Sequence, residues 1–131
     1  MIVIDSSALL AILFSEPEKG AFEEAIKGAR RCHISAVSVH ETATVLRLRQ
    51  GAAAVEWFWE ILQLSQMQVV SFDETQARAA AEAYGRYGKG IHSKARLNLA
   101  DCASYALAKT MDAPLLFKGS DFAHTDVKIC L

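Results

Sequence analysis

The sequence predicts an α/β protein, a three-layer α/β/α sandwich built around a parallel sheet. Short β-branched and apolar runs alternate along the chain with longer stretches whose apolar residues recur at helical spacing. Strands that alternate with helices are typical of a parallel sheet covered on both faces. With 131 residues, of which 52% are hydrophobic, the chain has enough apolar material for one core, and we expect a single domain over residues 1–131.

The first half of the chain opens on a strand and continues with helices around a second strand. The run from Ile2 to Ile4 is typical of a buried strand, which ends at Asp5. Ser15, followed by Glu18 three residues later, predicts a helix start, and Gly28 predicts its end. We therefore expect a strand at 2–4, helices at 8–14 and 15–27, a strand at 32–35, and helices at 36–50 and 52–64.

The second half repeats the alternation but contains one long loop. Asp73 and Gln76 predict a helix start directly after a third strand. The segment 85–96 holds three glycines and several basic residues without apolar periodicity, which favours a loop. The expected elements are a strand at 68–72, a helix at 73–84, this loop, a helix at 97–111, a strand at 114–117 and a weaker strand at 127–130.

Charge and cysteine content exclude several classes of protein. The chain carries 14 Lys and Arg against 15 Asp and Glu, so only the placement of the charges can indicate a nucleic-acid partner. Three cysteines without a C-x-x-C spacing argue against a disulfide framework and a structural zinc site. No basic leader precedes an apolar stretch, and no run approaches the roughly 18 apolar residues of a membrane span. We expect a cytoplasmic protein with no membrane partner.

Four acidic residues fall where the strands are expected to end. Asp5 closes the first strand, Glu41 lies in the first turns after the second, Asp101 opens the late helix, and Asp121 follows the fourth strand. Sites in open parallel sheets gather beyond the carboxyl ends of the strands, so the four carboxylates are expected to meet. Clustered carboxylates repel unless cations balance them. Oxygen ligands without His or Cys favour Mg²⁺ or Mn²⁺, which polarise phosphates and activate water, so the pattern points to phosphodiester hydrolysis.

Helix capping is the alternative explanation for three of these acids. Ser38-x-x-Glu41 and Asn98-x-x-Asp101 both have capping-box spacing, and Asp121 precedes a short turn at 122–125. Asp5 differs because it closes a wholly apolar strand and has no capping box of its own. The joint pattern of four acids, rather than any one of them, therefore carries the functional interpretation.

Four stretches of the sequence resemble one nuclease family. They are VIDSSALLAIL at the start, ISAVSVHETATVL around Glu41, GIHSKARLNLADCASYALAK around Asp101 and PLLFKGSDFAHTDV around Asp121. In this order they resemble PIN-domain nucleases, and most closely the VapC-type toxins of bacterial toxin–antitoxin pairs. The resemblance implies a PIN-like fold and a hydrolase, an endoribonuclease that cuts tRNA or ribosomal RNA. It also implies that Asp5, Glu41, Asp101 and Asp121 hold one or two Mg²⁺ or Mn²⁺ ions.

The resemblance further implies supporting residues and partners. Polar side chains near the acids would orient the metal ligands through hydrogen bonds, although turn and cap hydrogen bonding explains them equally well. These candidates are Ser6, Asn98, Thr125 and Asp126. The expected partners are RNA, a cognate VapB-like antitoxin and a second copy of the chain, with larger complexes when antitoxin is bound.

Basic residues between Gly85 and Leu97, with no acid among them, precede the helix that carries Asp101. Cationic side chains beside a metal site are typical of nucleic-acid binding, because they bind the backbone phosphates while the carboxylates bind the metal. The RNA-binding candidates are Arg86, Lys89, His92, Lys94, Arg96 and, further along, Lys118. An ordinary solvated loop is the alternative, and His92 fits a role in the loop better than one in catalysis.

The helix expected at 52–64 is apolar on two faces. Val55, Phe58, Trp59 and Leu62 share one face, and Trp57, Ile61 and Leu64 lie on another. Such a helix is either enclosed by the fold or offers a surface to another chain. The resemblance favours a partner, an antitoxin segment lying over residues 46–64 and reaching toward the acids.

Two other classes of protein share parts of the pattern. A phospho-receiver domain is also a small α/β fold with acids beyond its strands and a lysine such as Lys118. Against it, Ile4 precedes Asp5 where a receiver carries an acid pair, and no acid ends the strand at 68–72. A dehalogenase-type phosphatase would need a second aspartate two residues after Asp5, where Ser7 stands. A catalytically inactive PIN-like binding module is the third alternative.

Overall fold

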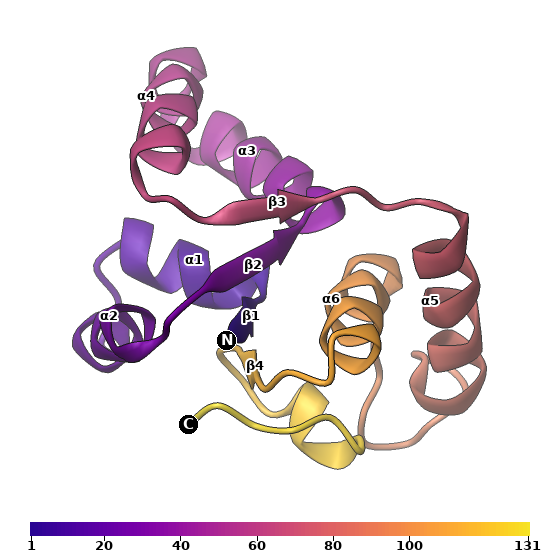
Figure 1. The fold of residues 1–131 in the computed structure, drawn as a ribbon. Helices are drawn as coiled ribbons and strands as arrows, with labels where there is room; N and C mark the ends of the chain where they lie inside the picture. The colour runs from indigo at the N-terminus through magenta and orange to yellow at the C-terminus, as the bar shows by residue number, and fades with distance from the viewer.

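Four short parallel strands form the centre of the molecule, described over residues 1–131 by a computed structural model (Figure 1). The strands are β1 (Ile2–Ile4), β2 (Cys32–Ser35), β3 (Gln68–Val70) and β4 (Leu115–Leu116). Their order across the sheet is β3-β2-β1-β4, and every neighbouring pair is parallel. The first strand of the chain therefore lies inside the sheet, between β2 and β4.

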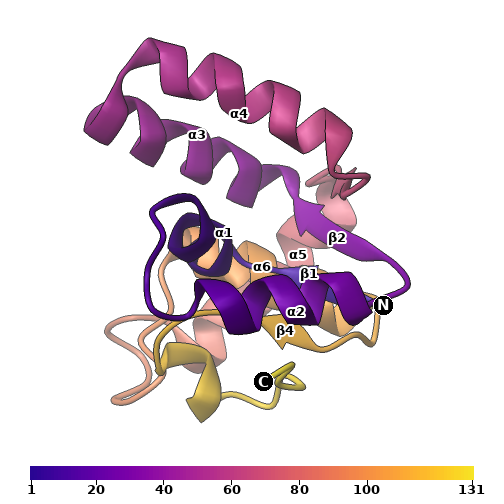
Figure 2. The same ribbon diagram turned by 90° about the vertical axis from the view of Figure 1, so that its left-hand side faces the viewer.

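Six α-helices cover the two faces of this sheet. They are α1 (Ser6–Leu13), α2 (Lys19–Gly28), α3 (Ala36–Gln50), α4 (Ala52–Leu64), α5 (Glu74–Tyr87) and α6 (Leu99–Thr110), followed by the short 3-10 helix η1 (Asp121–His124). Figures 1 and 2 show α1 to α4 gathered on one side and α5 with α6 on the other. The predicted three-layer sandwich is confirmed. None of these helices has both the length and the apolar character needed to cross a bilayer.

The alternation of side chains along β1 divides the core into two clusters. Ile2 and Ile4 pack with α1 to α4, whereas Val3 packs with α5 and α6. Successive strand residues point to opposite faces, and a strand buried on both faces must therefore be apolar throughout. The Ile-Val-Ile run meets this requirement, and Val3 and Ile4 are completely buried. The apolar run thus places Asp5 at the end of a fully buried strand inside the sheet.

The start of α2 was predicted wrongly. Ser15 does not cap it but adopts a left-handed backbone conformation with φ of 53°, and α2 begins at Lys19 without a side-chain cap. The chain must turn sharply between α1 and α2, and the backbone N–H of Glu16 donates back to the carbonyl of Ala11 at 2.8 Å. Tight turning therefore decides the conformation of Ser15, in spite of the capping-box spacing.

The second half departs from the prediction mainly at the ends of its elements. Helix α5 continues to Tyr87, which shortens the loop, and α6 begins at Leu99, two residues after the predicted start. The predicted strand at 127–130 is only a backbone bridge. The N–H of Leu115 donates to the carbonyl of Lys128 at 2.8 Å, and the N–H of Cys130 donates to the carbonyl of Leu115 at 3.0 Å.

Candidate active site

The four acidic residues come from segments that the fold brings to the carboxyl end of the sheet. Asp5 directly follows β1, and Glu41 lies in the second turn of α3, directly after β2. Asp101 stands in the first turn of α6, and Asp121 begins η1 after β4. The negative charges of Asp5, Glu41 and Asp121 all act on Asp101. The parallel topology thus collects the acids as predicted.

Asp5 is the most enclosed of the acids, with 2% of its surface exposed. Its Oδ1 accepts a hydrogen bond of 2.5 Å from Ser104 Oγ, and its Oδ2 accepts one of 3.0 Å from the backbone N–H of Ser7. The second bond makes Asp5 the N-cap of α1, although it has no capping box. The sequence did not predict this cap, because the helix was expected to start at Ala8 instead of Ser6.

Glu41 is held by a neighbour of Asp5. The Ser6 hydroxyl donates to Glu41 Oε1, which ties the start of α1 to α3. The predicted capping box between Ser38 and Glu41 is wrong, because Ser35 caps α3 by accepting the N–H of Val37 at 3.1 Å. The helix begins three residues earlier than that box requires, so Glu41 takes no part in capping and is available to the cluster.

Ser38 is fully buried inside α3 and forms a hydrogen bond of 2.9 Å with Ser104 Oγ. Because Ser104 also donates to Asp5, a chain of hydroxyls links α3 through α6 to the carboxylate at the end of β1. Buried polar groups need such partners to avoid a desolvation cost of about 1–3 kcal/mol each. Neither serine was predicted from the sequence to support the acids, since Ser38 was considered only as a helix cap. The one available signal was that each lies three residues from a predicted acid, on the same helix face.

Asp101 takes part in the capping box of α6, and its carboxyl group has a strongly raised pKa. The predicted capping box is confirmed, since Asp101 N–H donates to Asn98 Oδ1 at 2.8 Å and Asn98 N–H donates to Asp101 Oδ2 at 3.0 Å. Burial raises the pKa of the Asp101 carboxyl to about 7, the bond from Asn98 opposes this rise, and the charges of Asp5, Glu41 and Asp121 add to it. A carboxyl with this pKa at neutral pH is common in active sites.

Asp121 is exposed and borders a hollow of about 340 Å³ together with Asp101. The other residues that line this hollow are Lys89, Arg96 and Asn98. Asp121 does not cap the turn that follows it, because Ser120 occupies the cap position and no side-chain cap bond forms. The hollow is therefore polar, with carboxylates on one side and cationic side chains on another.

The donor chemistry of this cluster fits a hard divalent cation. All four acids offer oxygen, and their mutual repulsion at Asp101 is the kind that a cation relieves. The side chains are nevertheless not drawn together, since no three acidic, histidine or cysteine residues form a ready-made ligand set. The case for a metal therefore rests on charge and donor type. The hydrogen bonds to Asp5, Glu41 and Asp101 each leave carboxylate lone pairs free.

The four orienting candidates fall into two pairs. Ser6 and Asn98 hold Glu41 and Asp101 directly. Thr125 instead donates to the carbonyl of Phe122 at 2.7 Å, a bond within its own turn. Asp126 accepts hydrogen bonds from Tyr105 and Lys109, and Arg86 lies 3.8 Å from its carboxylate. The hydrogen bonds and ion pairs of Thr125 and Asp126 thus involve none of the four acids.

The candidate RNA-binding side chains differ in whether a carboxylate of the protein already pairs with their charge. Arg86 belongs to α5, where it stacks on Tyr87 and faces Asp126. Lys118 pairs with Glu16 at 3.1 Å and Glu18 at 3.6 Å, and its hydrogen bond to Glu16 raises its pKa. These ion pairs already compensate both charges. Arg86 and Lys118 are therefore the less available members of the predicted set.

The loop itself is an ordered structure. His92 Nδ1 accepts the N–H groups of Lys94 at 3.1 Å and Ala95 at 2.9 Å, so this side chain closes a turn, as its loop interpretation requires. Two backbone bonds between the flanks, from Lys89 to Leu97 and from Leu97 to Tyr87, fasten the base of the loop. Lys89, Lys94 and Arg96 are exposed and take part in no ion pair. These three cations are the ones free to meet an anion.

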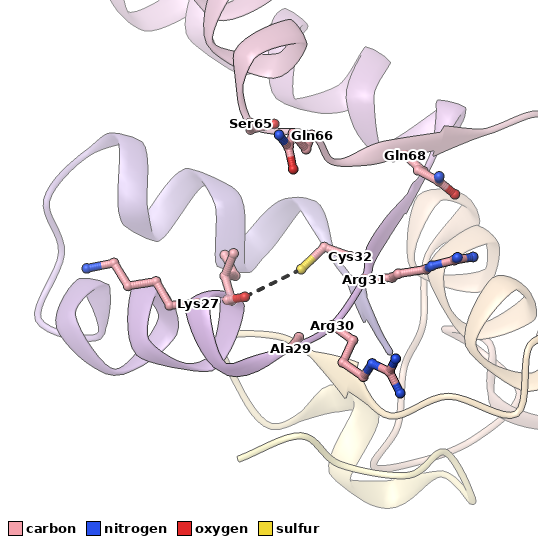
Figure 3. Close-up of a pocket in the computed structure, with 9 residues that line it drawn as sticks. Lys27, Ala29, Arg30, Arg31, Cys32, Ser65, Gln66 and Gln68 are labelled. Atoms are coloured by element: carbon pink, nitrogen blue, oxygen red, sulfur yellow. Dashed lines mark hydrogen bonds between the residues drawn. The ribbon is translucent and has the colours of Figure 1, made fainter.

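Another hollow, of about 550 Å³, lies at the opposite end of the sheet, where β2 begins (Figure 3). It is lined by Lys27, Arg30 and Arg31 among others, and Cys32 Sγ contacts the carbonyl of Ile26 at 3.8 Å. Figure 3 shows the three cationic side chains pointing away from one another. Because they do not converge and no catalytic acid is near, this hollow is not the candidate active site.

One apolar face of helix α4 packs against the rest of the fold, and the other is exposed. Val55 and Phe58 are buried, whereas Trp57, Ile61 and Leu64 remain 46%, 37% and 80% exposed. Figure 2 shows α3 and α4 lying side by side, with α4 on the outside. The second face of α4 is thus an exposed apolar surface rather than part of the core.

Comparison with known proteins gives a consistent result. Residues 2–128 match the family model of the PIN domain. The chain is 46% identical over 125 residues to Ribonuclease VapC of Mycolicibacterium smegmatis, and the alignment covers 95% of this chain and 96% of that protein.

Solved structures show the same architecture. Mycobacterium tuberculosis VapC20, described as a sarcin–ricin loop cleaving toxin, superposes with a TM-score of 0.80 at 18% identity, over 97% of this chain and 96% of that one. VapBC2 of Rickettsia felis, solved bound to a DNA fragment from their promoter, gives a TM-score of 0.72 at 16% identity, over 98% and 96%. At these identities the likenesses establish the fold alone.

Proposed function

Because this chain belongs to the PIN-domain family and is a ribonuclease of the VapC type, we propose that it is a toxin that hydrolyses RNA with Mg²⁺ or Mn²⁺. Asp5, Glu41, Asp101 and Asp121 would hold one or two ions. The substrate would be a structured cellular RNA, tRNA or ribosomal RNA, and the reaction would take place in the cytoplasm.

The observation that carries the metal proposal is the raised pKa of Asp101, to about 7. Burial is the largest cause of this rise, and the negative charges of Asp5, Glu41 and Asp121 add to it, so the ionised carboxyl of Asp101 is disfavoured at this place. An RNA phosphate would add further negative charge to the same place. A bound cation would therefore lower the electrostatic cost of bringing a phosphate to the acids.

The chain's own residues have distinct tasks in this mechanism. Ser104, Ser7 and Ser6 fix the Asp5 and Glu41 carboxylates by hydrogen bonds, and the capping box fixes Asp101. When bound, the metal would polarise the phosphate and make water a stronger nucleophile. Lys89 and Arg96, which border the hollow beside Asp101, would hold the neighbouring phosphates.

The proposed partner of the toxin is a VapB-like antitoxin. The exposed face of α4 formed by Trp57, Ile61 and Leu64 offers an apolar surface of the kind that an antitoxin segment would cover. A basic side chain from that segment would balance the acids in place of the metal. We also propose a homodimer, and a larger complex when antitoxin is bound.

The alternatives are less well supported. The sheet order β3-β2-β1-β4 differs from the 2-1-3-4-5 order of flavodoxin-like receivers, and the relatives are ribonucleases. An inactive binding module would have no need of four acids held at one end of the sheet.

Cleavage of total cellular RNA by the purified protein tests the proposal. Wild type, Asp5→Asn and the surface control Glu82→Gln would each be incubated with Mg²⁺, Mn²⁺ or chelator, and new RNA ends would be mapped by sequencing. We expect metal-dependent ends with wild type and Glu82→Gln and none with Asp5→Asn. Identical end profiles in every reaction would refute the nuclease, and cutting that persists in chelator would refute its dependence on metal.

A further inference from the structure

We propose that the hollow bordered by Tyr84 and Leu99, next to the acids, receives one unstacked nucleobase of the RNA and thereby helps to select the cutting site. The inference rests on the proposed function and adds to it a contact that recognises one base of the substrate. The hollow measures about 610 Å³ and is lined by Glu41, Tyr84, Lys89, Asn98, Leu99 and Ala100.

The position of this hollow ties it to the site of cutting. Glu41 is one of the four acids, and Lys89 and Asn98 line both this hollow and the smaller one beside Asp101 and Asp121. The two hollows therefore share a wall. An RNA strand whose phosphate lies at the acids would bring an adjoining nucleotide into the larger hollow.

The ring of Tyr84 is held in one orientation before any RNA arrives. Its hydroxyl donates to the carbonyl of Lys89 at 2.9 Å. The ring also lies against Gly88 so closely that a Cβ there would come within 2.6 Å of Tyr84 Cδ1. A side chain fixed at its tip and along one edge loses little conformational entropy when a base stacks on it.

The lining matches the chemistry of a nucleotide. Tyr84 supplies an aromatic surface, and Leu99, which is 83% exposed, supplies an apolar one at the rim. Lys89 carries a charge that no carboxylate compensates and so can meet the phosphate of the same nucleotide. The amide nitrogen of Asn98 donates to no group of the chain, because Asn98 caps α6 through its oxygen. It can therefore donate to an acceptor on the edge of the base.

A stacking site of this kind requires an unpaired base. Sequence-specific proteins read RNA mainly in loops and single strands, where bases can stack on aromatic side chains. The inference therefore places the cut within or beside a single-stranded region, and it predicts a base preference at one position next to the cut.

Three variants test the inference through the positions of cutting. Tyr84→Phe keeps the ring and loses the bond to Lys89, and Tyr84→Ala removes the ring. Gly88→Ala keeps the ring but shifts it together with the backbone at the end of α5, because a Cβ there would lie 2.6 Å from both Tyr84 Cδ1 and the Tyr84 carbonyl oxygen. We expect Tyr84→Phe to retain the wild-type base preference. Tyr84→Ala should lower kcat/KM about tenfold or more, mainly through KM, and should relax the preference. Gly88→Ala should alter the preference in the same direction.

Outcomes against the inference are distinct from those against the nuclease. If Tyr84→Ala cuts the same positions with the same base preference, the hollow holds no base, although the nuclease stands. If Tyr84→Phe is as defective as Tyr84→Ala, the residue anchors the loop and does not stack on RNA.

Binding of a mixed-sequence 12-nucleotide RNA in chelator tests the inference without cleavage. Tyr84→Ala should weaken this binding about tenfold. Unchanged affinity would also overturn the inference.

Discussion

Ser104 Oγ donates a hydrogen bond of 2.5 Å to Oδ1 of Asp5, across 99 positions of the sequence. The two residues belong to α6 and to the end of β1, and both are buried. Ser38 joins the same hydroxyl from α3 at 2.9 Å. The carboxylate at the centre of the candidate site is thus positioned by two helices that carry the other acids Asp101 and Glu41.

Ser104→Ala is expected to weaken metal binding without unfolding the protein. Losing a hydrogen bond that orients a ligand typically lowers metal affinity or activity 10- to 100-fold. The stability cost should be about 1–2 kcal/mol, because Asp5 and Ser38 lose a buried partner. The measurement is RNA cleavage as a function of Mn²⁺ concentration, with the exposed Ser71→Ala as control. A half-maximal Mn²⁺ concentration equal to that of Ser71→Ala would show that Ser104 does not position Asp5.

Asp101→Asn is expected to stabilise the metal-free protein near pH 8. The pKa of Asp101 is about 7 in the folded protein and about 3.9 in an unfolded chain. The folded state therefore binds more protons between these values, and the stability that Asp101 contributes is lost as pH rises through 7. Asparagine carries no charge and can still accept the N–H of Asn98.

Urea unfolding in chelator at pH 5 and pH 8 measures this effect. The variant should exceed wild type by about 1–2 kcal/mol at pH 8, a figure reduced for partial exposure, and the difference should shrink at pH 5. Added Mn²⁺ should stabilise wild type more than the variant. Equal stability of the two proteins at both pH values would mean that neither burial nor the neighbouring charges disfavour the ionised carboxyl of Asp101.

Lys94→Ala combined with Arg96→Ala is expected to weaken RNA binding and flatten its salt dependence. Each phosphate contact on a single strand contributes about 0.7 to the slope of log affinity against log salt, so losing both should reduce the slope by about 1.4. Arg86→Ala is the matched control, because its charge already faces Asp126. Fluorescence anisotropy in chelator over a salt series gives the slopes. A slope in the double variant equal to that of wild type would remove the loop from the RNA interface.

Asp126→Asn is expected to lower stability while leaving the response to metal unchanged. Hydrogen bonding from Tyr105 holds the pKa of Asp126 below its usual value, and Lys109 and Arg86 add to this effect. Weakening these contacts at a largely exposed carboxylate should cost about 1 kcal/mol. Thermal unfolding and the Mn²⁺ dependence of cleavage would be measured together. A marked rise in the Mn²⁺ requirement would instead restore Asp126 as a residue that orients the metal ligands.

The sequence predicted the layers, and the position of the acids at one end of the sheet, because both depend on simple patterns. Strand–helix alternation determines which end of a parallel sheet collects polar residues, and Asp5 and Asp101 needed only that pattern. It could not predict Ser104, because its partner Asp5 lies 99 residues away and no local spacing encodes the contact. The capping spacings at Ser15 and Ser38 were misleading for local reasons. The chain turns sharply at Ser15, and Ser35 instead of Ser38 caps α3.

The order of the strands also has a consequence for synthesis on the ribosome. β1 is among the first residues to emerge, yet Val3 pairs with Leu115, and Asp121 emerges later still. Pairings so distant along the chain cannot form until their second member has been translated. A nascent chain therefore exposes Asp5 without the remainder of the candidate site. The four acids cannot come together until synthesis has passed residue 121.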